Sequence, residues 1–474
     1  MSEQGKQNMQ AEESVKTHAE TESEQGHHHS HGEHHHHHSS HHHSHGHHHH
    51  HHPSRRRRKK GWSTKSQEKF KNFFKYNKHY LIYAAMTVAF LVCLMLVGGL
   101  LDNHHEEPKL PSGDQNGNGT EVPGVSETLS EIQVKVPLFS EKVKVTGEAV
   151  DAWISAEAGV TVTDIYNQYA GGSVRLDAAR PMTLYYEVSG LPAGEKVKSA
   201  EVLVADNEAM TSPMRYTTSG NKSSVDVYNL KTGTQYYFRV KLTLAGGAVA
   251  TAGGCFQTAE GPRIMTVGGV CNIRDIGGWK TTDGRVIKQG LLYRGRELDG
   301  SVEATYLINA EGVNTMLTQL GIKTEMDLRM PSENPYGLNV LGPGVEHIYY
   351  SAPMYVNIFN GTENPEKIRA IFADLADESK YPVYLHCTYG QDRTGTVCYL
   401  LGALLGMDAD SLAKEYALSG LCYGGVEQEL FEAFVLKVGS LPGNTLSEKV
   451  ESYLVSIGVT AEEIASIRSI FLDE

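Results

Sequence analysis

Residues 383–395 read VYLHCTYGQDRTG, and an apolar stretch, TVCYLLGALLG, follows them. The pattern predicts a short buried strand, a polar loop that starts at Cys387, and a helix that is entered through residues 394–395. Successive backbone N–H groups at the N-terminus of a helix form a site for an anion, and Gly390 allows the sharp turn that points them inward. We expect substrate to bind at Thr388, Tyr389, Gly390, Gln391 and Thr394.

The side chains of this loop suggest phosphoester chemistry. The helix terminus and Arg393 favour the thiolate form of Cys387, and Arg393 offers a planar fork to two phosphate oxygens. A thiolate beneath a bound phosphate predicts a phosphocysteine intermediate that is then hydrolysed. Thr394 can donate a hydrogen bond to the departing thiolate, and Asp392 could protonate the leaving oxygen. This chemistry requires no metal and no cofactor. We expect His386 to hold the loop by hydrogen bonds.

Strands and helices alternate around the loop. Residues 324–328 and 382–386 have the composition of short buried strands. Helical periodicity extends over residues 394–405, 408–418, 427–438, 446–456 and 460–472. We therefore predict an α/β domain over residues 262–474, with a mainly parallel sheet flanked by helices.

Four motifs in this domain resemble those of a known family. Residues 262–474 are similar to bacterial tyrosine phosphatases of the HCxxGxDRTG type, which include secreted dual-specificity and phosphoinositide phosphatases. Besides the loop, the resemblance rests on NIRDIGG at 272–278, LYRG at 292–295, and DLR at 327–329 followed by Glu333. The resemblance implies that Cys387 is the nucleophile, that Arg393 binds phosphate, and that Asp392 is the general acid.

One position departs from the pattern. Relatives that act on phosphoinositides often carry lysine where this chain has Gln391, and a neutral amide adds no charge for further phosphates. We therefore expect phosphotyrosine on proteins or peptides to be the substrate, with phosphoserine and phosphothreonine as further candidates. The alternatives are a phosphatase of phosphoinositides or inositol phosphates, and an inactive phosphopeptide-binding module.

A second module precedes the α/β domain. Residues 131–258 have short apolar and aromatic runs between Gly, Pro and Asn breaks, which predicts a β-sandwich. Leu230, Thr234 and Tyr236 resemble the corner of fibronectin type III domains, where a tyrosine hydrogen-bonds back to upstream backbone. Such a module more often spaces or binds than catalyses.

The first 130 residues predict a membrane anchor. Residues 80–101 carry no charge and no proline, and as a helix they would span about 33 Å, the thickness of a bilayer core. Eleven Lys and Arg lie between residues 55 and 78, so we expect the N-terminus to be cytoplasmic and the catalytic domain extracellular. We expect the protein to be anchored in the plasma membrane of a bacterium, by preference a Gram-positive one. Residues 102–130 read as a flexible linker.

Composition and charge limit the kinds of binding partner that we expect. Residues 1–79 form a basic tail in which 20 of the 25 histidines precede residue 53, and the tail could bind a divalent metal or remain a solvated, disordered segment. The rest of the chain from residue 102 holds 30 Lys and Arg against 48 Asp and Glu, which argues against nucleic acid as a partner. Six cysteines in 474 residues are too few for a disulfide scaffold, although Cys255, Cys271 and Cys422 could pair.

Overall fold

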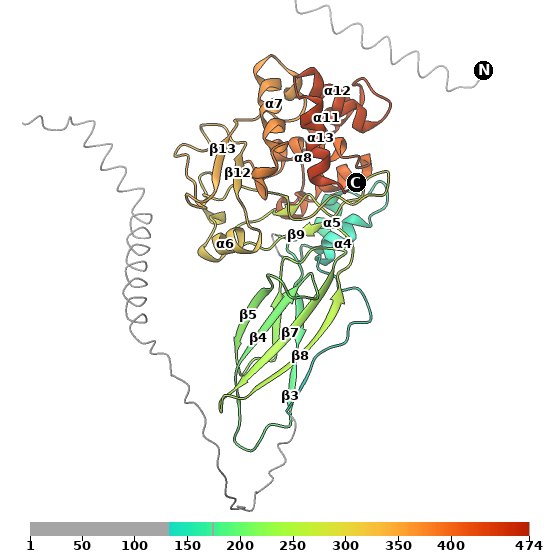
Figure 1. Cartoon of the computed structure of the whole chain (residues 1–474). Coiled ribbons are helices and arrows are strands. Elements are labelled where there is room, and N and C mark those ends of the chain that lie inside the picture. Colours follow the sequence, from blue (N-terminus) through green and yellow to red (C-terminus); the bar gives the residue numbers. More distant parts are fainter. Residues whose placement is uncertain (1–131, 173–174, 474) are drawn as a thin grey trace, which may run out of the picture. The chain divides into compact units, whose positions relative to one another are not determined.

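The computed structural model describes residues 132–172 and 175–473. The predicted tail, the predicted membrane span at 80–101 and the predicted linker all lie outside these residues. Among the helices of the described ranges, none is long and apolar enough to cross a membrane. Figure 1 shows the described part of the chain in colour, with strands concentrated in its first half and helices in its second.

The β module has one four-stranded antiparallel sheet with the order β5-β4-β7-β8, and two pairs of strands, β1-β3 and β2-β6. Its strands are β1 (Gln133–Lys135), β2 (Met182–Tyr185), β3 (Glu187–Ser189), β4 (Val197–Ala205), β5 (Met214–Ser219), β6 (Ser224–Val227), β7 (Gln235–Leu244) and β8 (Val249–Gln257).

Buried and exposed side chains alternate along β7, and the buried ones form the core of this module. Every second side chain of the strand, from Tyr236 to Leu244, is buried, as expected for a strand with one face on a core. These side chains pack with those of β2, β4 and β6 in a separate apolar core. The Tyr236 hydroxyl accepts the backbone N–H of Lys231 at 2.8 Å, which is the bond that the sequence predicts for the corner. The likeness to fibronectin type III domains itself stays a prediction.

Two helices interrupt the range in which only strands were expected, and for these residues the prediction is wrong. They are α4 (Glu148–Ile154) and α5 (Val162–Tyr169). Val150, Trp153 and Ile165 place apolar side chains on one face of these helices, and a capping box between Thr161 and Asp164 starts α5. Their buried side chains belong to the core of the α/β domain rather than to that of the β module. A helical period within a short stretch is easily missed between two groups of strands.

The α/β domain has a six-stranded mixed sheet with the order β13-β12-β14-β11-β10-β9. Its strands are β9 (Arg263–Ile264), β10 (Arg274–Asp275), β11 (Leu292–Gly295), β12 (Thr324–Asp327), β13 (Glu346–Tyr349) and β14 (Val383–His386). The four strands from β13 to β11 are parallel, and the two edge strands β10 and β9 run antiparallel. The predicted parallel centre is confirmed, and the antiparallel edge makes the sheet mixed.

Five helices of this domain lie where the periodicity predicts them, within about two residues at each end. They are α8 (Asp392–Leu404), α9 (Ala409–Ala417), α11 (Gln428–Gly439), α12 (Leu446–Ser456) and α13 (Ala461–Phe471). The sequence did not predict the other three, α6 (Ala310–Asn314), α7 (Glu363–Leu375) and α10 (Gly420–Tyr423). Shorter turns are η1 (Ala304–Tyr306), η2 (Thr315–Gln319), η3 (Tyr355–Phe359) and η4 (Glu378–Lys380). Residues 394–404 of α8 are all buried, so this helix lies inside the domain and carries the loop before it on a rigid support.

The packing of α4 leads to a stability prediction. Trp153 is 8% exposed, lies in the α/β core, and donates its indole N–H to the Lys414 carbonyl at 3.0 Å. Trp153→Ala should lower the free energy of unfolding by about 3–5 kcal/mol, as loss of a buried aromatic side chain does. The measurement is the denaturant midpoint at which catalytic activity is lost. Tyr185→Ala, on the exposed side of β2, should leave this midpoint unchanged. An equal midpoint for wild type and Trp153→Ala would place α4 outside the catalytic fold.

Candidate active site

The loop between β14 and α8 brings together all the residues that the sequence marks as a site. β14 ends at His386 and α8 begins at Asp392, so residues 387–391 form a loop at the carboxyl edge of the central strand. Cys387 and Thr388 are each 2% exposed, whereas Tyr389 is 43% exposed. The loop therefore presents one open side chain on a base that is otherwise buried.

Gly390 is required by the path of the loop. Its φ is +69°, in the left-handed region. A Cβ at this position would lie 2.2 Å from the backbone carbonyl of Gly295 at the end of β11. Both the conformation and the close approach of two backbones exclude any residue with a side chain.

The carbonyl groups of the loop are bound from behind. Asn272 donates its side-chain amide to the Tyr389 carbonyl at 2.9 Å, and the Tyr423 hydroxyl donates to the same oxygen at 2.7 Å. Arg294 donates through Nη2 to the Gly390 carbonyl at 2.5 Å, with a longer contact to that of Gln391. Since C=O and N–H point in opposite directions across a peptide plane, the amides that follow face the other way. In the described structure the backbone N–H groups of residues 389–391 donate to no other residue, which leaves a cradle for an anion.

The arginine behind this arrangement is part of a buried charge network. Arg294 is fully buried and pairs with Glu415 at 2.7 Å, and Glu415 pairs with Arg274 at 2.7 Å as well. Burial raises the pKa of Glu415, but the two arginines outweigh it, so the net pKa is lowered. Glu415 therefore stays ionised and keeps both guanidinium groups in fixed positions.

Arg393 is held at the other side of the cradle by Glu333. The guanidinium donates to both carboxylate oxygens at 2.5 and 2.7 Å, and Thr388 donates its hydroxyl to the same carboxylate at 2.8 Å. Burial raises the pKa of Glu333, yet the hydrogen bonds from Arg393, Thr388 and the Met330 backbone, together with the charge of Arg393, outweigh it and the pKa falls to about 2. Glu333 is thus ionised at neutral pH and sets the direction in which the Arg393 fork points.

Asp392 has a defined partner. The Tyr355 hydroxyl donates to Asp392 Oδ1, and it also lies 2.6 Å from the Tyr416 hydroxyl. Burial, reinforced by the Asp392 carboxylate, raises the pKa of Tyr355 far above its ordinary value, so Tyr355 remains a donor. One carboxylate oxygen of Asp392 is held by this bond, and no described residue donates to the other.

Two residues that flank the loop, His386 at the end of β14 and Thr394 in α8, are both fully buried. The His386 ring lies 3.0 Å from Glu325 and 3.2 Å from the Cys387 carbonyl, fully buried beneath the loop. Burial lowers the pKa of His386, but the Asp327 and Glu325 carboxylates outweigh it and raise the net pKa. Thr394 is fully buried, and its hydroxyl has no hydrogen-bond partner among the described residues. That hydroxyl is available to a group that enters the cradle.

A groove of about 300 Å³ adjoins Arg393. Its apolar part is formed by residues 352–354 and Met330, and its polar part by Asn357, Asn364 and Lys367. Within the described structure Lys367 has no ion pair. A group attached to a phosphate in the cradle can therefore extend into a groove that has both apolar and cationic lining.

Sequence reasoning named the loop but missed the residues that orient it. Tyr355 and Lys367 belong to no quoted motif and reach the site only through the fold. Asn272, Arg294 and Glu333 do lie in the quoted motifs, so the motifs were a signal that these side chains face the loop. The described residues contain five free cysteines and no group of three or more His, Cys, Asp or Glu side chains that could hold a metal ion.

Part of the chain is similar to known phosphatases. Residues 265–473 match the model of the tyrosine phosphatase family. A protein of Cupriavidus necator named "putative tyrosine-protein phosphatase" is 26% identical over 196 residues, which is 36% of this chain and 69% of that protein. A crystal structure of the core catalytic domain of the PP-IP phosphatase SIW14 from S. cerevisiae, in complex with citrate, is 16% identical with a TM-score of 0.22; the match covers 32% of this chain and 90% of that one.

The match to the family model and the 26% identical relative define the class of the protein: it is a phosphoric monoester hydrolase. More particularly, its α/β domain matches the model of the tyrosine phosphatase family over residues 265–473, and the enzyme is protein-tyrosine-phosphatase-like.

The hydrogen bond at Asp392 leads to a kinetic prediction. If Asp392 protonates the leaving oxygen, Asp392→Asn should slow hydrolysis of phosphopeptides about 10²–10⁴-fold. Nitrophenyl phosphate should be affected much less, because its leaving group needs no proton. The measurement is kcat/KM for both substrates. Equal losses on both would assign Asp392 a role in loop structure alone and leave the acid to another group, such as Asp327.

Proposed function

We propose that the protein hydrolyses phosphotyrosine monoesters through a phosphocysteine intermediate. The observation that carries this proposal is the placement of Cys387 at the start of a loop whose carbonyl groups are bound on one side and whose amides donate to no described residue, with Arg393 paired to Glu333 beside it. Such a site binds the phosphate of a monoester with its phosphorus above the sulfur.

The reaction has two steps. In the first, Cys387 Sγ forms a bond to phosphorus, the bond from phosphorus to the substrate oxygen breaks, and Asp392 gives its proton to that oxygen. In the second, water attacks phosphorus, Asp392 takes a proton from the water, and the sulfur leaves as a thiolate. The free Thr394 hydroxyl supports this step, since it can donate to the departing sulfur. Atoms and protons balance, with inorganic phosphate as product.

The groove beside Arg393 supports a substrate with an aromatic leaving group. Met330 is 49% exposed and lines the groove together with Met354. Thioether side chains make favourable contacts with aromatic rings, and a phosphotyrosine ring is long enough to reach past a deep anion site. The neutral Gln391 side chain, only 8% exposed, argues in the same direction because it adds no charge for a second phosphate.

We extend the proposal to the whole chain. The basic flank before residue 80 and the apolar run at 80–101 support a single-pass anchor with the catalytic domain outside a bacterial plasma membrane. The β module would then be a fibronectin type III-like unit between the membrane and the phosphatase. Its antiparallel sheet, its own apolar core and the Tyr236 corner bond support this part of the proposal.

The catalytic proposal is tested with Cys387→Ser. The variant should lose turnover and still bind phosphate, because the loop amides and Arg393 remain in place. Wild-type protein should be assayed against phosphotyrosine peptides, phosphoserine peptides, phosphoinositides and soluble inositol phosphates. We expect the highest kcat/KM for the phosphotyrosine peptides. Turnover that survives Cys387→Ser would contradict the mechanism, and a preference for an inositol substrate would contradict the proposed substrate class.

The topology is tested separately. Protease added to intact protoplasts should remove the chain beyond residue 102 and spare the histidine-rich tail, because the basic flank stays inside. Antibodies to the two ends of the chain report which end is lost. A protected catalytic domain would mean the opposite orientation or no anchor.

A further inference from the structure

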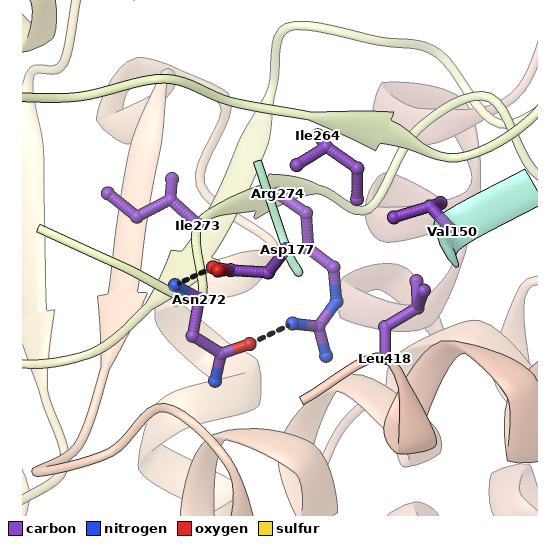
Figure 2. A pocket seen from close by; sticks show the side chains of 7 residues that line it. All are labelled: Val150, Asp177, Ile264, Asn272, Ile273, Arg274 and Leu418. Carbon is purple, nitrogen blue, oxygen red and sulfur yellow. Dashed lines mark hydrogen bonds between the residues drawn. The ribbon is translucent and has the colours of Figure 1, made fainter. Parts of the chain in front are cut away.

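Asp177, which precedes the β module's strand β2, is connected to the active-site loop through Asn272. Its carboxylate accepts the backbone N–H of Asn272 at 2.6 Å, across 95 residues of sequence. Figure 2 shows this bond at a small cavity of about 10 Å³ between α4, the segment around β10 and the end of α9. Asp177 is 6% exposed and also accepts from Arg175 at 3.0 Å.

The backbone of Asn272 needs this acceptor. Its φ is +56°, a left-handed conformation that asparagine tolerates better than most residues. Asn272 is 1% exposed, so its N–H would be buried without a partner if the Asp177 carboxylate were absent. The bond therefore fixes both the position and the unusual conformation of Asn272.

The side chain of Asn272 carries this constraint to the catalytic loop. Its amide nitrogen donates to the Tyr389 carbonyl at 2.9 Å and to the Ser419 hydroxyl at 3.2 Å. Its oxygen accepts from Arg274 at 2.6 Å, a bond also drawn in Figure 2. The Tyr389 carbonyl is one of those turned away from the cradle, so its direction sets that of the Gly390 amide on the opposite side.

The segment that carries Asp177 is anchored in the catalytic domain. The Leu176 N–H donates to the Leu421 carbonyl at 2.8 Å, and the helices α4 and α5 just before it are part of the α/β core. A Cβ on Gly420 would approach Val162 of α5 to 2.6 Å, so the two segments pack without space between them. The backbone next to Asp177 is thus anchored in the catalytic domain.

We propose that Asp177 is a positioning residue of the phosphatase, which acts through Asn272 to aim the phosphate-binding amide of Gly390. The part of the chain before residue 262 is then required for the chemistry, and it is more than a spacer. The proposal rests on the phosphatase activity and is independent of which phosphoester is the natural substrate.

The test uses the full chain with nitrophenyl phosphate as substrate and inorganic phosphate as a competitive probe. Asp177→Ala should lower kcat/KM and weaken phosphate binding, each about 10-fold, since a buried hydrogen bond to a charged group is lost. Asp177→Asn keeps an oxygen acceptor and should recover most of both. The matched control is Asp164→Ala, which breaks the capping box of α5 but contacts Asn272 nowhere. It should lower the melting temperature and leave phosphate affinity unchanged.

A double mutant keeps the proposal falsifiable if Asp177→Ala does not fold. Asn272→Gly retains the backbone N–H and tolerates the left-handed conformation, but it removes the contact with Tyr389. Asp177→Ser, whose shorter side chain withdraws the oxygen acceptor from the Asn272 N–H, should therefore lower phosphate affinity less in the Asn272→Gly background than in wild type. Equal effects in both backgrounds, or normal phosphate affinity in folded Asp177→Ala, would overturn the proposal. A wild-type chain that binds phosphate but hydrolyses no monoester would instead contradict the enzymatic function.

Discussion

The active site depends on hydrogen bonds that its loop accepts on the side away from the substrate. Asn272, Tyr423 and Arg294 bind the carbonyl oxygens of residues 389–391, and this leaves the amides of the same peptides directed into the cradle. An anion site made of backbone amides is only as well defined as the peptide planes that carry them. Buried donors on the side away from the substrate therefore fix the conformation of the catalytic loop before any substrate binds.

Burial of charged donors costs free energy, and in this domain ion pairs with buried carboxylates offset that cost. Arg294 and Arg274 lie in the interior and share the Glu415 carboxylate, so two charges are compensated by one buried anion and several carbonyl oxygens. On the opposite side, Glu333 compensates Arg393 in a bidentate pair. Removal of one member would leave a buried charge unpaired, which is far more destabilising than replacement of the whole set by apolar residues.

Buried contacts also connect the part of the chain before the α/β domain to the active site. α4, α5 and Asp177 precede most of the β module in sequence, yet they complete the core and the polar base of the α/β domain. Asn229 and Arg263 add contacts between the two parts, since Arg263 donates to the Asn229 carbonyl at 2.7 Å and also pairs with Asp275 at 2.8 Å. The β module and the phosphatase are therefore joined by buried polar contacts, which constrain orientation more strictly than apolar contacts do.

The sequence alone determined the loop, its cysteine and arginine, and the central strands and helices, because these depend on local patterns: an apolar strand, a glycine turn and a helical period over ten or more residues. Only the tertiary structure decided which side chains orient the loop. Asn272, Tyr355 and Asp177 lie tens to hundreds of residues from Cys387, and no periodicity reports a hydrogen bond across such a separation. Only the tertiary structure likewise showed that α4 and α5 pack on the core of the α/β domain. The apolar face of a helix indicates that the helix is covered, but it does not indicate which of two neighbouring cores covers it.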